Sequence, residues 1–156
     1  AQLAAILPVE YFEFNPPDLI INNIRSAHCD LRKLPFADSS LKTVSCLHVL
    51  EHIGLGRYGD EVNPNGMKNA CKELIRCVAE GGSLIVSFPV GKHSVEFNAH
   101  RITNPLTALT YFPTMKLKKF SYVDDHGLYI ENANPEDSVD MNYACGMFWL
   151  IKTKLS

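Results

Sequence analysis

Two short segments carry the side chains of this chain that are best suited to acid–base chemistry. The first is H-V-L-E-H at residues 48–52, and the second is F-N-A-H-R at residues 97–101. A histidine, with an ordinary pKa of about 6.5, can take a proton from an oxygen or nitrogen nucleophile near neutral pH. Because each segment follows a predicted parallel strand, we expect the two to meet at one edge of a sheet. His52 and His100 are therefore the candidate catalytic bases.

The first segment also fits a rival chemistry. H-x-x-E-H is the inverted zinc-peptidase pattern, in which His48 and His52 bind a metal from one face of a helix. Glycines follow at positions 54, 56 and 59, and each costs a helix about 1 kcal/mol, so a continuous helix is disfavoured. A third ligand such as Glu131 would come from a polar loop. We expect no metal, but zinc hydrolysis stays open, as does a structural role in which Glu51 and His52 brace a turn.

Two acidic residues stand near the ends of the first two predicted strands. Glu13 could accept the hydroxyl hydrogens of a ribose, and hydrogen bonds to a charged group contribute about 1.5 to 3 kcal/mol each. Asp30 begins the loop after the second strand. Solvated strand-end and turn roles remain open for both residues.

Alternating or continuous apolar segments predict the strands that position these groups. The predicted strands are Val9–Phe14, Ile24–Cys29, Leu41–Leu47, Ser83–Phe88, Lys116–Val123 and Ala144–Lys152. The third reads as a central strand covered on both faces. The last two lack a long helix between them, which favours an antiparallel pair at a sheet edge.

Helical spacing of apolar residues predicts an amphipathic helix over Met67–Ala79, which Asn65 could cap and Glu80-Gly81-Gly82 would end. Pro105 suits the first turn of a short helix that runs through Tyr111. The residues from 54 to 66 include four glycines and a proline, which indicates a long loop.

The string from Asp30, D-L-R-K-L-P-F-A-D-S-S-L-K-T-V-S-C-L-H-V-L-E-H-I, leads through a helix into E-G-G-S-L-I-V-S-F-P-V-G. It resembles the middle of a class I S-adenosylmethionine-dependent methyltransferase. The chain is most similar to a poorly characterised family of unknown function with H-V-L-E-H-I-G-L-G-R-Y-G-D, F-N-A-H-R and a terminal Y-x-C-G-x-F-W. The resemblance covers nearly the whole chain. It implies an α/β fold with a doubly wound, mostly parallel Rossmann-like sheet and an antiparallel C-terminal strand pair.

The resemblance also implies S-adenosylmethionine as cofactor and assigns its contacts. Asp30 would accept from the adenine amino group, and Leu31 would offer its backbone amide. Glu13 would hold the ribose, while Leu47 and His48 would lie beside the methionine moiety. The Glu-His pair after the third strand would then stand near the acceptor pocket, where a histidine would deprotonate the nucleophile during methyl transfer.

One expected feature of the superfamily is missing. The glycine-rich turn that follows its first strand has no counterpart, since no glycine precedes Gly54. We therefore expect one methyltransferase-like domain over residues 1–156 that lacks the first strand and is incomplete at its N-terminus. Ala1–Leu7 would be the end of the helix after the missing turn. Val9–Phe14 would pair directly with Leu41–Leu47 or leave backbone groups unpaired.

Composition narrows the partners of this domain. The net charge is −2 and the basic residues are scattered, so capture of nucleic acid or an anionic membrane is not indicated. No run of 18 apolar residues occurs. The cysteines number five and form no C-x-x-C pair, which favours free thiols in a reducing, cytoplasmic compartment.

The sequence thus predicts an S-adenosylmethionine-dependent methyltransferase, with the possibility that this chain is inactive. A non-catalytic methyltransferase-like module that binds a metabolite or a protein is the alternative from another class. Fold-level likeness does not choose the methyl acceptor or the oligomeric state, and both stay unknown.

Overall fold

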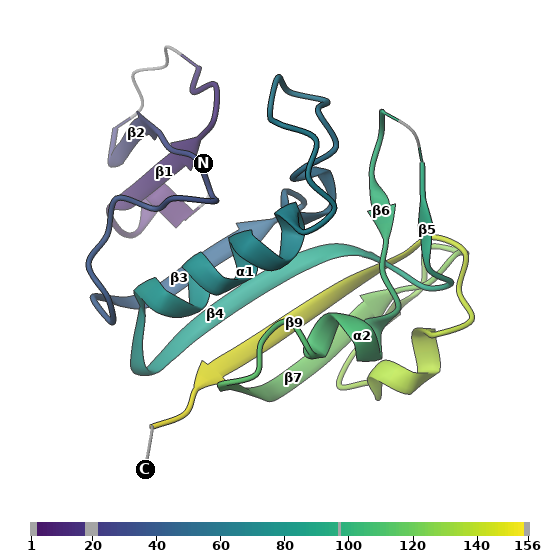
Figure 1. Cartoon of the computed structure of the whole chain (residues 1–156). Coiled ribbons are helices and arrows are strands. Elements are labelled where there is room, and N and C mark those ends of the chain that lie inside the picture. Colours follow the sequence, from purple (N-terminus) through teal and green to yellow (C-terminus); the bar gives the residue numbers. More distant parts are fainter. Residues whose placement is uncertain (1–2, 18–21, 97, 155–156) are drawn as a thin grey trace. The chain divides into compact units, whose positions relative to one another are not determined.

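The computed structural model describes residues 3–17, 22–96 and 98–154. The chain divides into two compact units, Ala1–Pro35 and Phe36–Ser156, and each is considered by itself (Figure 1).

The first unit is built on two parallel strands. Its elements are η1 (Leu3–Ala5), β1 (Val9–Glu13) and β2 (Ile24–His28). Glu13 pairs with His28, and the Cys29 amide donates to the Glu13 carbonyl at 2.9 Å, so both strands end at the same edge. The two predicted strands are confirmed to within one residue. Of the predicted helix at 1–7, residues 1 and 2 lie outside the described part, and a single 3₁₀ turn occupies Leu3–Ala5.

The second unit is a five-stranded sheet with two α-helices. Its elements are β3 (Leu41–Leu47), η2 (Leu50–His52), α1 (Gly66–Cys77), β4 (Val78–Val90), β5 (Ser94–Val95), β6 (Arg101–Ile102), α2 (Pro105–Leu109), β7 (Met115–Val123), β8 (Tyr129–Ile130), η3 (Pro135–Ser138) and β9 (Ala144–Lys152). The strand order is β3-β4-β9-β7-β8. β3 and β4 are parallel, and β9 is antiparallel to both β4 and β7. β7 therefore runs in the same direction as β3 and β4.

This topology confirms the α/β class and the antiparallel C-terminal strand pair. The position of that pair differs from the prediction, because β9 lies inside the sheet between β4 and β7 and the edge on that side is the two-residue β8. β3 also differs. It is an edge strand, and Cys46 is its single buried residue, whereas β4 is buried along most of its second half. The apolar run in β3 therefore does not mark a strand covered on both faces.

Backbone pairing moves the end of the predicted helix. α1 ends at Cys77, and the fully buried, β-branched Val78 is already extended as the first residue of β4. Gly81, with φ of 71°, lies inside this strand and not at a helix C-terminus. There the pairing shifts from Leu41 with Val78 to Thr43 with Ser83, so β4 bulges. The glycine pair therefore belongs to a bulge in the strand. The sequence alone had assigned the pair to the end of a helix.

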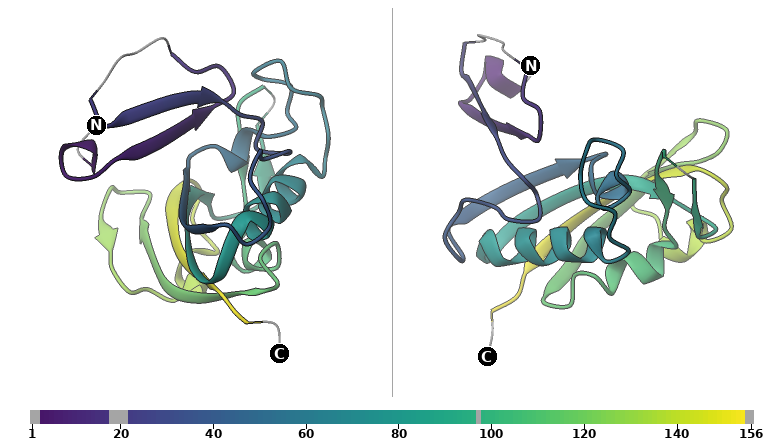
Figure 2. Two further views of the ribbon diagram at one scale, coloured as in Figure 1. Left: turned by 90° about the vertical axis from the view of Figure 1, so that its left-hand side faces the viewer. Right: turned by 45° about the horizontal axis from the view of Figure 1, so that its top comes forward.

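α1 and α2 lie on one face of the five-stranded sheet (Figure 2). Phe88 of β4 and Phe148 of β9 are buried and stack, with ring centroids 5.1 Å apart. Asn104 caps α2 by accepting from two backbone amides, and the helix ends at Leu109, two residues before the predicted end. In the part of the chain that the structure describes, no helix is both long and apolar enough to cross a membrane.

Candidate functional site

The carboxyl ends of β3 and β4 carry a cluster of imidazole and carboxyl groups. His48 follows β3 directly, and its amide donates to the Ser87 carbonyl of β4 at 2.8 Å. The φ of His48 is 53°, a left-handed conformation that is uncommon outside glycine. This sharp turn leads at once into η2, which holds Glu51 and His52.

Arg101 fixes η2 in place. Its guanidinium donates to the Ile53 carbonyl at 2.6 Å and to the Glu51 carbonyl at 3.4 Å. The residue is buried, and burial lowers the pKa of its guanidinium. Arg101 thus donates to backbone carbonyls. Carbonyls at the end of a 3₁₀ turn lack a partner within the helix, and Arg101 supplies one.

Glu51 is the buried acid of the cluster, with 2% of its surface exposed. Its Oε1 atom lies 3.1 Å from His48 Nδ1 and 3.8 Å from His52 Nε2. Among the described residues, its Oε2 atom has no hydrogen-bond partner. A buried carboxylate oxygen without a partner is costly, so it marks a site where stability has not been maximised.

His52 and His100 come together, with ring centroids 6.5 Å apart. His52 Nδ1 donates to the Ala99 carbonyl at 2.6 Å, since a carbonyl only accepts. Its Nε2 faces Glu51, so both of its ring nitrogens are directed at acceptors. These contacts hold the His52 ring in a fixed orientation.

His100 is the less constrained imidazole. Its ring packs against Tyr143 at 5.0 Å, and no hydrogen bond to its ring nitrogens occurs within the described residues. Asn98 lies in the same segment, exposed and with φ of 52°. Residues 98–101 lead into the short strand β6, which the sequence pattern did not predict.

The geometry does not fit the zinc-peptidase arrangement. His48 has left-handed backbone and Leu50–His52 is 3₁₀, so no continuous α-helix carries both histidines. Over the described ranges, no three His, Cys, Asp or Glu side chains are grouped as metal ligands.

The predicted adenosine residues lie at the carboxyl edge of the first unit. Asp30 accepts from the Arg32 amide at 2.8 Å and is ion-paired with the Arg32 guanidinium at 3.0 Å. This side-chain hydrogen bond lowers the pKa of the Asp30 carboxyl. Glu13 accepts from the Tyr11 hydroxyl and from the Phe14 amide. Leu31 follows Asp30 in the loop after β2.

The sequence matches a family described as "Caenorhabditis protein of unknown function, DUF268" over residues 3–142. The chain belongs to the DUF268 family. No curated protein matches it.

Solved structures similar to this DUF268 chain share the methyltransferase fold. An S-adenosylmethionine-dependent methyltransferase from Methanosarcina mazei has a TM-score of 0.63 at 13% identity, over 98% of this chain and 86% of that one. The N-methyltransferase NodS from Bradyrhizobium japonicum, in complex with S-adenosylhomocysteine, has a TM-score of 0.56 at 11% identity over 86% of this chain. The [4+2]-cyclase SpnF has a TM-score of 0.58 at 12% identity over 84% of this chain. The DUF268 chain spans 57% of the length of NodS and of SpnF.

The remaining predicted cofactor residues lie in the second unit. Leu47 ends β3 with 54% of its surface exposed, and His48 follows it. Sequence reasoning had no role for Cys145, whose Sγ lies 3.3 Å from His48 Nε2. Burial, and then the charge of Glu51, raises the pKa of this thiol. The available signal was the Y-x-C-G-x-F-W pattern of the DUF268 chain, which singles out one cysteine in the last strand.

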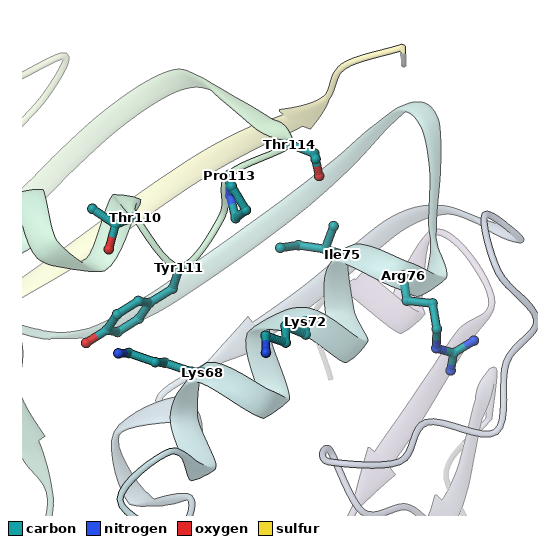
Figure 3. Close-up of a pocket in the computed structure, with 8 residues that line it drawn as sticks. All are labelled: Lys68, Lys72, Ile75, Arg76, Thr110, Tyr111, Pro113 and Thr114. Atoms are coloured by element: carbon teal, nitrogen blue, oxygen red, sulfur yellow. The ribbon is translucent and has the colours of Figure 1, made fainter. Parts of the chain in front are cut away.

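A separate groove of about 470 Å³ lies between α1 and the segment after α2 (Figure 3). Lys68 and Lys72 of α1 line it together with Tyr111, and the Lys68 ammonium lies 5.3 Å from the Tyr111 ring centroid. None of the predicted site residues of the DUF268 chain lines it.

Proposed function

We propose that this DUF268 chain is an S-adenosylmethionine-dependent methyltransferase with an acceptor of unknown class. The observation that carries the proposal is the approach of His100 to His52, which follows the parallel strand β3, in a fold similar to that of the Methanosarcina mazei methyltransferase. Fold likeness alone does not choose the reaction, since SpnF shares the fold and is named a cyclase. The proposal therefore depends on the side chains.

The proposal keeps the cofactor residues that the sequence predicted. Glu13, Asp30 and Leu31 hold the adenosine, and Leu47 and His48 contact the methionine part. Each Glu13 carboxylate oxygen accepts one hydrogen bond, so lone pairs remain for a ribose. Both oxygens of Asp30 already accept from Arg32, so the adenine amino group must displace part of that contact. S-adenosylmethionine, when bound, supplies an electrophilic methyl group.

The histidines divide the proton chemistry between them. His100 takes the proton from the oxygen or nitrogen of the acceptor as the nucleophile attacks. His52 positions His100, because the ring nitrogens of His52 itself face Ala99 and Glu51. A base that only has to accept one proton near neutral pH contributes about 100-fold to a rate.

Cofactor binding is the first test. Titration calorimetry of the chain with S-adenosylmethionine and with S-adenosylhomocysteine should give micromolar binding. Asp30→Ala should abolish it, whereas Asp38→Ala, which removes another loop acid that is ion-paired with Arg76, should leave it unchanged. A cooperatively folded chain that binds neither compound would refute the proposal.

Base catalysis is the second test. The chain, supplied with radiolabelled S-adenosylmethionine, is screened against small alcohols, phenols and amines. For any acceptor found, His100→Asn should lower kcat about 100-fold with little change in cofactor affinity. His93→Asn, a histidine in the preceding turn, is the matched control and should retain full activity. Equal kcat in both variants would remove His100 from the mechanism.

A non-catalytic module is a second candidate, favoured by the prior engagement of Asp30 by Arg32. It predicts ligand or protein binding without methyl transfer.

The reducing, cytoplasmic location belongs to the same set of proposals. It is supported by the five cysteines, each of which the structure describes as a free thiol.

A further inference from the structure

Cys145, His48 and Glu51 form a continuous hydrogen-bonded row at the carboxyl end of β3. A carboxylate only accepts, so His48 Nδ1–H donates to Glu51 Oε1 at 3.1 Å. This leaves Nε2 as the acceptor of the imidazole, and Nε2 is the atom that lies 3.3 Å from Cys145 Sγ. The thiol therefore donates to an imidazole whose tautomer is fixed by a buried acid.

The backbone holds this row together across the sheet. His48 follows β3 and Cys145 lies in β9, with β4 between the two strands. Neighbouring strands are about 4.8 Å apart, so an imidazole beside β3 must reach over β4 to meet a β9 side chain. The left-handed φ of His48 turns the chain sharply at that point. Strained backbone of this kind is often found where a side chain is aimed for a purpose.

The row is reachable from solvent at its reactive end. The His48 side chain is half exposed, Cys145 is partly exposed, and Glu51 is buried. The other four cysteines are buried, and burial raises the pKa of the Cys71 thiol to about 12. Among the described thiols, Cys145 is thus the partly exposed one, and it has a base beside it.

We propose that Cys145, His48 and Glu51 form a nucleophilic thiol site for acyl transfer, with small esters or thioesters as its substrate class. A thiol, an imidazole and an orienting carboxyl group in hydrogen-bond sequence are the parts that such catalysis requires. Nucleophile and base are within reach of one another, and the base is oriented by the third group.

The chemistry favours acyl over methyl transfer at this thiol. In the acyl step the Cys145 proton passes to His48 Nε2 as Sγ attacks the carbonyl carbon, a C–S bond forms, and the bond to the leaving oxygen or sulfur breaks. The proton on Nε2 then passes to that leaving atom, and Glu51 stabilises the transient imidazolium. In methyl transfer the sulfonium donor leaves as a neutral thioether that needs no proton, so His48 would serve only as the base. In acyl transfer it serves twice, as the base for Sγ and as the acid for the leaving atom.

The thiol of the site rests in its protonated form. Burial and the charge of Glu51 raise the pKa of the Cys145 thiol, so His48 acts as a general base at the moment of attack and not as the partner of a preformed thiolate.

The test uses p-nitrophenyl acetate as the acyl donor. The full chain is mixed with this ester, and acetylation is followed residue by residue with peptide mass spectrometry. Cys145 should be acetylated first, and His48→Asn, which tolerates left-handed backbone, should slow this step about 100-fold. His126→Asn removes a turn histidine outside the row and should leave the rate unchanged. Equal Cys145 rates in wild type and His48→Asn would overturn the proposal.

A rescue experiment separates chemistry from folding. His48→Gly removes the imidazole at a position whose positive φ glycine adopts freely. Added imidazole should restore site-specific acetylation of Cys145 in this variant but not in Cys145→Ser. Circular dichroism confirms that the variants are folded. Acetylation confined to lysines in the wild-type chain, or absence of rescue in a folded His48→Gly chain, would refute the acyl-transfer site.

Discussion

The two units of the chain satisfy the polar groups at their strand ends in opposite ways. In the first unit, Asp30 finds its partner two residues away in Arg32. In the second unit, Arg101 reaches back to η2, and His48 contacts Cys145, which is 97 positions away in the chain. Local pairs form wherever the chain turns, whereas long-range pairs exist only once the sheet has formed. The polar cluster at the carboxyl ends of β3 and β4, here called the second edge, therefore depends on tertiary structure. Among the described residues, it alone keeps a buried carboxylate oxygen unpaired.

A substitution in the loop after η2 should have the largest effect on stability, because this loop begins directly after Ile53, whose carbonyl Arg101 binds. A Cβ added to Gly54 would lie 2.3 Å from the Asn63 carbonyl oxygen, and its φ is 79°. Gly54→Ala should lower the free energy of unfolding of the second unit by about 3 kcal/mol, from strain and displaced backbone together. Urea denaturation, followed by Trp149 fluorescence, measures the change.

Gly59 in the same loop is the matched control. It has φ of 83°, but no atom lies within 4 Å of its added Cβ. Gly59→Ala should therefore cost only the left-handed strain, about 1 kcal/mol. Equal losses in the two variants would show that the loop contact at Gly54 does not support the edge.

Arginine substitutions compare the two edges directly. Arg101→Met leaves the carbonyls of Glu51 and Ile53 without their buried donor, and should lower the free energy of unfolding by about 2 kcal/mol. Arg32→Met breaks a partly exposed ion pair and should cost less than about 1 kcal/mol. Urea denaturation of both variants gives the comparison. A larger loss for Arg32 would reverse the contrast between local and long-range pairing.

Sequence patterns predicted most of the strands for a physical reason. β3 and β9 have the predicted bounds because their alternation and apolar content are local properties. The boundary between α1 and β4 was wrong, since Gly81 bulges a strand whose pairing with β3 is not visible in local spacing. The two-residue strands β5 and β6 escape prediction because only their tertiary contacts define them.

The residues of the candidate site also divide into those that local patterns predict and those that only tertiary contacts bring together. The sequence singled out His52 and His100 because their segments each follow a predicted strand. It assigned no role to Cys145, because nothing in the spacing of the chain brings that residue to His48. The buried state of Glu51 also could not be predicted, since it depends on the packing of η2 against α1, β4 and β6 in the folded second unit. Patterns thus locate an edge of the sheet, but partners across it come from the fold.

Substitution of Glu51 tests whether this residue lowers the stability of the second edge. If Glu51 only braces the turn, its removal should destabilise the chain. Because its Oε2 is buried without a partner among the described residues, we expect Glu51→Met to raise the free energy of unfolding by about 1 kcal/mol. The same variant should slow acetylation of Cys145, since His48 loses its orienting carboxylate. Thermal unfolding with the acetylation assay measures both, and a clear loss of stability would support the bracing role.

The smallest expected effect is a pH dependence of stability at the first edge, the carboxyl end of β1 and β2. The hydrogen bond from the Arg32 guanidinium, helped by the Arg32 amide, lowers the pKa of Asp30 below its ordinary value. A depressed carboxyl pKa contributes stability that is present above the unfolded pKa of about 3.9 and is lost as pH falls through the folded pKa. Since the pair is partly exposed, we expect the loss to stay below about 1 kcal/mol. Carboxyl ¹³C titration by NMR should place the Asp30 pKa below the ordinary range in the wild-type chain and return it toward that range in Arg32→Gln. An unchanged pKa in this variant would mean that the local pair does not hold the acid, and the contrast between the two edges would then rest on the second edge alone.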